Sequence, residues 1–262
     1  MIFETHAHYE DKKFDSDRVE LLRTMPCLGI SPVVNVGSTI ETTKQSIQLA
    51  DDYSFIYAAA GIHPSEISEL DENSMEWLKQ QAKHPKVAAI GEIGLDYYWE
   101  KDEEVREKQR YWFKKQLAVS KDAGLPVIIH SRDAAKDTME IMKDAYEVGI
   151  KGVIHCFSYS EEIAQEYVGM GYFIGVGGVV TFKNAKKLKE VVSKIPLKWI
   201  LLETDCPYMA PEPYRGKRNS SAYLPFVVKE IARIKDVTEQ EVIETTRENA
   251  YRMYWKIKEY EK

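Results

Sequence analysis

The chain has 262 residues, of which 44% are hydrophobic and 30% are charged, a composition that can bury a sizeable core. Its 36 basic and 42 acidic residues give a net charge of −6, which excludes a protein coated in basic residues for general nucleic-acid binding but leaves room for a local basic patch. No break in composition divides the chain, so we predict a single domain over residues 1–262.

The sequence gives no sign of secretion or membrane insertion. It has no apolar stretch long enough to cross a bilayer, and its first residues lack the apolar region of a signal peptide. Its three cysteines, Cys27, Cys156 and Cys206, are odd in number and widely spaced, which predicts reduced thiols. We therefore expect a cytoplasmic protein without membrane contact, and no feature indicates an obligatory protein partner.

Eight apolar runs of strand length follow one another along the chain: 2–8, 32–38, 55–64, 87–96, 126–133, 152–158, 172–178 and 199–207. Several are almost continuously apolar, as is typical of parallel strands buried on both faces. Helical periodicity separates them, most clearly over 103–124, where Gly124 ends the pattern. A last helix is predicted over 238–260, where Thr238 and Glu241 have the spacing of a capping box. This alternation predicts βαβ units.

The positions of the histidines favour a closed (β/α)8 TIM barrel over an open doubly wound sheet. All histidines except His84 lie at or just beyond the C-terminal end of one of the eight runs, namely His6, His8, His63, His130 and His155. Glu92 and Asp205 are placed at the ends of the fourth and eighth runs. Active sites of α/β barrels lie at this end of the strands, whereas histidines with packing roles have no reason to share one rim.

Histidines and carboxylates that converge from different strands are typical ligands of a metal-dependent hydrolase. His6 and His8 are two residues apart in a strand, so their side chains point the same way, as does that of Glu4. Four histidines with two carboxylates exceed the needs of one ion, so we predict two divalent metal ions with one carboxylate between them. Nitrogen and oxygen ligands leave Mg²⁺, Mn²⁺ and Zn²⁺ open.

The motifs, taken together and in order, resemble those of the TatD-related metal-dependent deoxyribonucleases of the amidohydrolase superfamily. They are ETHAH (4–8), GIHP (61–64), AIGEIGLDYY (89–98), PVIIHSRDA (126–134), GVIHCFS (152–158), LLETDCPYMAP (201–211), RGKRN (215–219) and ENAYRMY (248–254). The resemblance covers nearly the whole chain. It implies a (β/α)8 barrel that binds divalent metals and hydrolyses DNA.

The resemblance also implies a role for each ligand. His6, His8 and Asp205 would hold one ion, His130 and His155 would hold the other, and Glu92 would bridge the two. The expected reaction is hydrolysis of a phosphodiester, with Asp205 as general base and no covalent enzyme intermediate. The expected substrate is DNA, processed as a single strand by 3′ to 5′ exonuclease action.

The chain departs from the family pattern at three places. Glu4 stands where aspartate is more usual, and Tyr9 stands where leucine is usual. After RGKRN the chain has Ser220 and Ser221, where an acidic residue and a proline are more usual. None of these changes removes a ligand, but the last one alters the entry to the following helix.

Further residues near the predicted rim are candidates for supporting roles. Glu203 is two residues before Asp205 and is expected to orient a ligand histidine, and Asp96 is expected to fix its loop or a ligand histidine. His63 is expected either to contact a phosphate or a water on the metal, or simply to pack in its loop. Cys156 and Cys206 are interpreted as packing residues, with Cys156 turned away from its neighbour's face.

Basic and aromatic residues at the same rim suggest contacts with a nucleic acid. Arg132, Arg215, Lys217 and Arg218 could contact backbone phosphates, which attract Arg and Lys whatever the base sequence. Tyr97, Tyr98 and Trp99 could stack on a base, with packing as the alternative role.

Two other functions stay open at this point. The same fold could hydrolyse an amide, ester or lactone, either in a small molecule or in aminoacyl-tRNA, because a fold does not fix its chemistry. A barrel that binds nucleic acid without catalysis is the other alternative, although all six ligand positions are filled in this chain.

Overall fold

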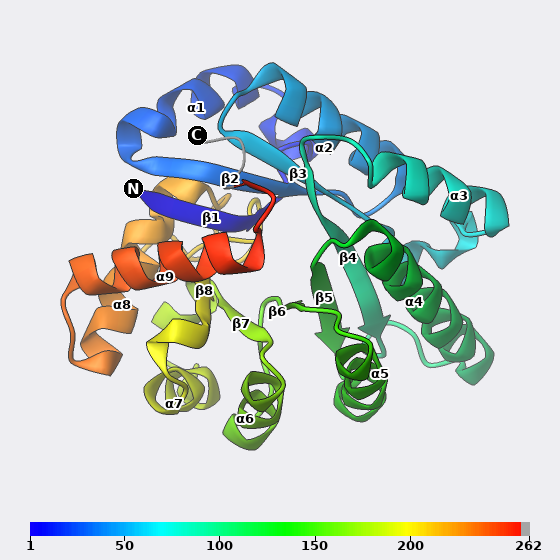
Figure 1. Cartoon of the computed structure of the whole chain (residues 1–262). Helices are drawn as coiled ribbons and strands as arrows, with labels where there is room; N and C mark the ends of the chain where they lie inside the picture. Colours follow the sequence, from blue (N-terminus) through cyan, green and yellow to red (C-terminus); the bar gives the residue numbers. More distant parts are fainter. Residues whose placement is uncertain (258–262) are drawn as a thin grey trace.

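The computed structural model describes residues 1–257 and contains one eight-stranded sheet with the order β1-β2-β3-β4-β5-β6-β7-β8 (Figure 1). Each pair of neighbours in this order is parallel. The strands are β1 (Ile2–Ala7), β2 (Ile30–Val36), β3 (Ile56–Ala60), β4 (Val87–Asp96), β5 (Val127–Arg132), β6 (Gly152–Ile154), β7 (Phe173–Val176) and β8 (Ile200–Leu202).

The two ends of the sheet meet just beyond β8, where Ala7 forms a parallel bridge with Cys206. The His8 amide donates to the Cys206 carbonyl at 2.8 Å, and the Asp205 amide donates to the His6 carbonyl at 3.0 Å. These bonds close the barrel and confirm the predicted (β/α)8 fold. They also fix the first-strand histidines beside Asp205.

Helices surround the barrel on its outside (Figure 1). They are α1 (Arg18–Thr24), α2 (Ile40–Asp52), α3 (Glu72–Gln81), α4 (Glu103–Ala123), α5 (Ala135–Glu147), α6 (Glu161–Gly169), α7 (Lys186–Lys194), α8 (Leu224–Lys235) and α9 (Glu239–Met253). Short 3-10 turns are η1 (Lys12–Phe14), η2 (Pro26–Leu28), η3 (Pro64–Glu69), η4 (Gly178–Thr181), η5 (Leu197–Trp199) and η6 (Ser221–Tyr223). The helix predicted over 103–124 is confirmed as α4, and Gly124 ends it with a φ of 63°.

The last helix begins as predicted, because the Thr238 side chain accepts a hydrogen bond from the Glu241 amide. It ends at Met253, not at residue 260, because Tyr254 turns into the N-terminal end of the barrel. There the Tyr254 hydroxyl donates to the Thr5 carbonyl at 2.9 Å, and its ring stacks on that of Phe3. The predicted residues 258–260 lie outside the described part of the chain. This packing fills one end of the barrel, so the functional site belongs to the other.

Several strands are shorter than predicted. β3, β6 and β8 end at Ala60, Ile154 and Leu202, so the polar residues that follow them lie in loops above the barrel. β4 has the predicted bounds of 87–96. Glu92 lies within it and not at its end, beside an irregular register with β5 between Ile90 and Ile93. The loops and this irregular strand carry the residues of the site.

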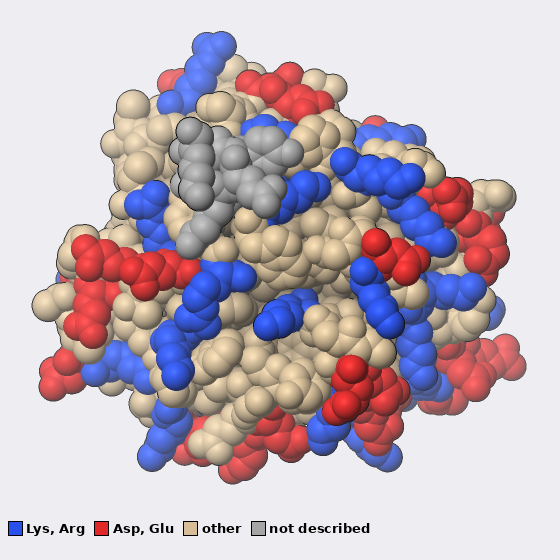
Figure 2. Space-filling model, viewed as in Figure 1, with Lys and Arg blue, Asp and Glu red and all other residues tan. Residues whose placement is uncertain are grey.

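The surface carries charges of both signs. On the face seen in Figure 2, Lys and Arg side chains are interspersed with Asp and Glu, consistent with the modest net charge of −6. Among the described residues, none of the helices is both long enough and apolar enough to span a membrane.

Candidate metal centre

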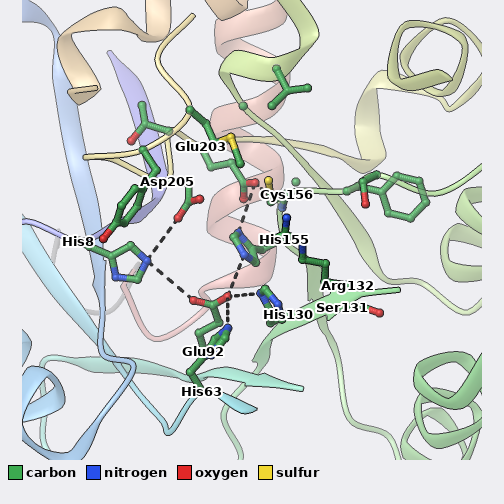
Figure 3. A pocket seen from close by; sticks show the side chains of 18 of the residues that line it. His8, His63, Glu92, His130, Ser131, Arg132, His155, Cys156, Glu203 and Asp205 are labelled. Atoms are coloured by element: carbon green, nitrogen blue, oxygen red, sulfur yellow. Dashed lines mark hydrogen bonds and ion pairs between the residues drawn. The ribbon is translucent and has the colours of Figure 1, made fainter. Parts of the chain in front are cut away.

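The carboxylate of Glu92 lies at the centre of a cluster of histidines (Figure 3). Its Oε1 atom is 2.8 Å from His130 Nδ1, 2.9 Å from His155 Nε2 and 3.8 Å from His63 Nε2. Its Oε2 atom instead faces the first strand, 3.6 Å from His6 Nε2 and 3.8 Å from His8 Nε2. Each oxygen of this carboxylate therefore faces a different group of histidines.

The group facing Oε2 consists of His6, His8 and Asp205, whose ligand atoms could hold one ion. The Nε2 atoms of the two histidines are 3.0 Å apart. Asp205 Oδ1 lies 3.8 Å from His6 Nε2 and 3.4 Å from His8 Nε2. The parallel bridge between β1 and the segment after β8 brings these three side chains together.

The group facing Oε1 includes His63, Glu92 and His130, which could hold a second ion, with His155 close by. His63 differs from the others, because its Nδ1 accepts a hydrogen bond from the Ser65 amide at 3.2 Å. In a neutral imidazole whose Nδ1 accepts, Nε2 carries the proton, so His63 presents a donor rather than a lone pair. Burial and the neighbouring His130 lower the pKa of His63 to about 3, which keeps the ring neutral.

The outward nitrogens of the histidines test whether these residues fit two cations. An imidazole that binds a metal through one nitrogen carries a proton on the other and needs an acceptor for it. The Val36 carbonyl lies 2.8 Å from His8 Nδ1, and Asp96 Oδ2 lies 3.1 Å from His130 Nε2.

His6 and His155 have their outward nitrogens near a shared carboxylate. Their Nδ1 atoms are buried without a hydrogen-bond partner, and so is Glu203 Oε2. All three residues offer ligand atoms within 4.8 Å of one another. Both imidazoles already direct Nε2 toward Glu92. The Glu203 carboxylate is therefore better explained as an acceptor for their two Nδ1 protons than as a ligand of a third ion. The donor set therefore fits two cations around Glu92.

The charges in the site also fit cations. Burial alone would raise the pKa of Glu92, but His155, His130 and His6 hold it well below its usual value. Burial would lower the pKa of His8, but Asp205 and Glu10 raise it well above 6.5. The carboxylates thus stabilise positive charge at the positions that face the two groups.

The site opens into a cavity of about 980 Å³ lined by several of the predicted residues. Of the predicted metal ligands, all except His6 line it, namely His8, Glu92, His130, His155 and Asp205. The predicted supporting residues His63, Asp96, Arg132 and Glu203 line it as well. Asp96 makes both contacts considered for it, because its Oδ1 accepts from the Tyr98 and Trp99 amides while its Oδ2 meets His130. Glu203 Oε1 lies 3.6 Å from His155 Nδ1 and accepts from the Cys156 amide.

The prediction that Cys156 turns away from its neighbour's face is wrong, because Cys156 lines the cavity beside His155. Strand alternation does not apply to it, because β6 ends at Ile154 and Cys156 has a φ of 44°. Burial together with Asp205 raises the pKa of Cys156 well above the usual value, so the thiol stays protonated. Cys206 is fully buried.

Arg215, Lys217 and Arg218 do not line the cavity. Arg218 is turned toward Asp17, with its two terminal nitrogens 2.8 and 2.5 Å from the carboxylate oxygens, and it lies over the Phe14 ring. The structure therefore does not bring Arg218 to the position expected for a phosphate contact. Arg132, in contrast, lines the cavity, with its guanidinium 3.9 Å from the centre of the Tyr98 ring.

The three aromatic residues after β4 have different environments. Tyr97 is buried and donates from its hydroxyl to Asp137 at 2.7 Å, so it packs instead of facing the cavity mouth. Tyr98 is 43% exposed and has Arg132 over its ring. Trp99 lines the cavity and is 71% exposed, the most exposed ring of the three, although Arg132 lies 5.7 Å from its centre.

Sequence reasoning missed residues of the cavity wall after β7. Asn184 and Lys187 line it, as does Tyr208 from the segment after β8. The signal was present as a run of lysines over residues 183–189, which has no histidine or carboxylate motif to draw attention to it.

Two departures from the family pattern contact each other. The Tyr9 hydroxyl donates to Ser221 Oγ at 2.7 Å and accepts from the Ser221 amide at 3.0 Å. Tyr9 is fully buried, so a tyrosine here needs the polar partner that Ser221 provides. The third departure, Glu4, is buried and accepts from the Thr204 amide and hydroxyl beneath the site.

Comparison with known proteins agrees with this geometry. Residues 3–255 match the family described as TatD related DNase. The metal-dependent hydrolase YabD of Bacillus subtilis (strain 168), named as uncharacterized, is 41% identical over 254 residues, which cover 97% of this chain and 99% of the relative.

Solved structures agree as well. The crystal structure of YjjV, a TatD homolog from Escherichia coli K12, has a TM-score of 0.90 at 30% identity and covers 97% of both chains. A TatD family hydrolase from Entamoeba histolytica, at 23% identity and a TM-score of 0.86 over 98% of both chains, has the same fold. The chain therefore belongs to the TatD-related DNase family, and it is a metal-dependent hydrolase.

Proposed function

We propose that the protein is a two-metal deoxyribonuclease that removes nucleotides from the 3′ end of single-stranded DNA. The observation that carries this proposal is the position of the Glu92 carboxylate, because its two oxygens face two separate groups of histidines. A carboxylate between two cation positions is the arrangement used for phosphoryl displacement. The family description, TatD related DNase, supports DNA as the substrate.

His6, His8 and Asp205 would hold one cation, and His130 and His155 would hold the other, with Glu92 shared. Bound there, Mg²⁺, Mn²⁺ or Zn²⁺ would neutralise charge on the phosphate and lower the pKa of a water. With metal bound, Glu203 and Asp96 would accept the outward protons of the ligand imidazoles, near which their carboxylates lie, and so fix the ring orientations.

Asp205 is the general base in this proposal. Its carboxylate lies beside His6 and His8 and lines the cavity, where an attacking water can reach it. Burial would raise the pKa of Asp205, but its hydrogen bond with His8 and the nearby His155 lower it, so the carboxylate is ionised and able to accept a proton. No covalent intermediate is required, and the protonated Cys156 is not a nucleophile.

Two residues on the other side of the cavity would position the substrate. His63 directs its Nε2 proton toward the centre and would donate to a phosphate oxygen. Arg132 would contact a phosphate through its guanidinium. The exposed Trp99 would stack on a base, as aromatic residues do in single-strand sites. A cavity of this kind accepts one strand more readily than a duplex.

The test uses purified protein that has been stripped of metal and reloaded with Mg²⁺, Mn²⁺ or Zn²⁺. Single-stranded and duplex oligonucleotides labelled at either end are compared with amide, carboxyl-ester and lactone substrates. The proposal predicts metal-restored release of mononucleotides from the 3′ end of single strands. Hydrolysis of an ester or lactone without cleavage of DNA would instead support the other hydrolase function. Tight DNA binding without turnover in any metal would support a binding protein.

A further inference from the structure

Two loops beside the cavity run next to each other, although they follow different strands. Residues 178–188, from η4 into α7, follow β7, and residues 208–217 follow β8. A Cβ atom on Gly178 would lie 2.1 Å from the Met209 carbonyl oxygen, so the two backbones are in direct contact. The Glu212 amide donates to Thr181 Oγ1 at 2.8 Å.

A third contact joins the loops through a cation. The Arg215 guanidinium lies 4.2 Å from the centre of the Phe182 ring. Both loops also contribute to the cavity wall, the first through Asn184 and Lys187 and the second through Tyr208 and Met209. The joined loops are therefore one surface that begins inside the cavity and continues outward from it.

This surface carries basic residues from both loops, which we call the basic rim: Lys183, Lys186, Lys187, Arg215 and Lys217. All five are exposed. Within residues 1–257, no hydrogen bond or ion pair occupies the charged group of any of the four lysines. Other cations nearby are already paired, since Lys189 lies 2.9 Å from Glu230 and Arg218 is bound to Asp17.

The basic rim therefore presents unpaired lysine ammonium groups beside the cavity. Tyr208 and Met209, which are 45% and 44% exposed, line the cavity and add apolar surface beside the rim, with Lys13 4.1 Å from the centre of the Tyr208 ring. Unpaired cations beside exposed aromatic surface are the features that bind a single nucleic-acid strand without reading its sequence.

We propose that single-stranded DNA whose 3′ end occupies the cavity continues over the basic rim, which binds the phosphates of the preceding nucleotides. This inference rests on the proposed function. It assigns phosphate contacts to Lys183, Lys186 and Lys187. It also gives Arg215 and Lys217 the phosphate-binding role expected from the sequence, but at a position outside the cavity. The rim would make affinity depend on strand length while leaving the chemistry at the metal centre unchanged.

The test compares the triple variant Lys183→Ala, Lys186→Ala, Lys217→Ala, whose three lysines do not line the cavity, with a control that carries Lys108→Ala, Lys114→Ala, Lys121→Ala. The control removes the same charge from exposed lysines of α4, which do not line the cavity. Binding of an oligothymidylate of about 12 nucleotides, within the range of single-strand site sizes, is measured against salt concentration in the presence of chelator. Cleavage of a dinucleotide, which is too short to extend from the metal centre to these three lysines outside the cavity, is measured with metal.

With about 0.7 counterions released per phosphate contact in single strands, loss of three contacts should flatten the slope of log affinity against log salt by about 2. The control should retain the wild-type slope, and dinucleotide cleavage should be the same in all three proteins. An unchanged slope in the rim variant, with DNA cleavage intact, would overturn the rim alone. Failure of the wild type to cleave either DNA substrate would count against the proposed function on which the rim rests.

Discussion

The Nε2 atoms of His6 and His8 lie 3.0 Å apart and both face Glu92. Two nitrogens bound to one Zn²⁺ at about 2.0–2.1 Å, with an angle between octahedral and tetrahedral values, would be separated by about 2.8–3.4 Å. The first strand therefore holds the two imidazoles at the spacing that one ion requires. Strand alternation explains why a histidine pair two residues apart can do this.

Asp205→Asn should abolish most cleavage while retaining DNA binding. The amide keeps the shape of the side chain but cannot accept a proton, and loss of a general base costs about 10²–10⁴ in rate. Weaker metal binding should add to this loss. Single-turnover cleavage at saturating metal measures the effect, and Asp11→Asn serves as a control from the same cavity wall. Near-wild-type cleavage in Asp205→Asn would exclude this carboxylate as the base.

Glu203→Gln should weaken metal binding. The carboxylate lies near the outward nitrogens of both His6 and His155, which have no other acceptor, whereas a glutamine can present only one carbonyl oxygen to them. Loss of such a partner reduces metal affinity by about 10–100-fold. Competition with a chromophoric chelator measures the affinity. Glu66→Gln, a carboxylate of the same cavity without contact to a ligand, should bind metal normally. Equal affinities in the two variants would remove Glu203 from this role.

Glu4→Gln should change how stability depends on pH in the metal-free protein. Burial raises the pKa of Glu4 from 4.5 to about 7, so the folded state binds a proton that the unfolded state has released. The stabilisation from protonated Glu4 is complete below pH 4.5 and is lost as the pH rises through about 7. Over this range it amounts to a loss of about 3 kcal/mol.

Glutamine can replace the neutral acid at this position, because its oxygen can accept from the Thr204 amide and its nitrogen can donate to the Thr204 hydroxyl. Chemical denaturation with chelator at about pH 5 and pH 8 should show the variant gaining stability over the wild type as pH rises. A constant difference between the two proteins would show that Glu4 does not titrate in this range.

Arg218→Ala should affect stability and leave DNA binding unchanged. Arg218 bonds to Asp17 through two nitrogens and covers Phe14, joining the η1 region to the segment after β8. The pair is about one-third exposed, so its loss should cost about 1 kcal/mol or less. In a double-mutant cycle with Asp17→Asn, the two changes should be less than additive. A flatter salt dependence of DNA binding in Arg218→Ala would instead show that this residue contacts phosphate.

The barrel and most of the site residues could be predicted from the sequence, because each depends on a local pattern. Apolar runs predict the strands, and the rule that active sites of α/β barrels lie at the C-terminal ends of strands identifies His6, His130 and Asp205. The ends of β3, β6 and β8 could not be predicted, because the apolar pattern continues past the last ladder hydrogen bond. This is why Cys156 faces the cavity against expectation. β4, in contrast, has the predicted bounds of 87–96, and Glu92 lies in its interior and not at its end.

Pairing between distant side chains was also beyond the sequence. Arg218 and Asp17 are about 200 positions apart, and no local pattern indicates that the guanidinium turns to that carboxylate and not to a phosphate. Tyr9 and Ser221 each read as a separate departure from the family, yet they form one contact in the folded chain. Contacts of this kind depend on how loops from different strands meet above the barrel.

The two-metal mechanism is tested most directly by a metal titration of chelator-treated protein, with metal content and DNA hydrolysis followed in the same samples. We predict that hydrolysis of single-stranded DNA is lost with the metal and returns as two divalent ions bind per chain. Hydrolysis that persists at undetectable metal content would contradict this mechanism, as would full activity with a single bound ion.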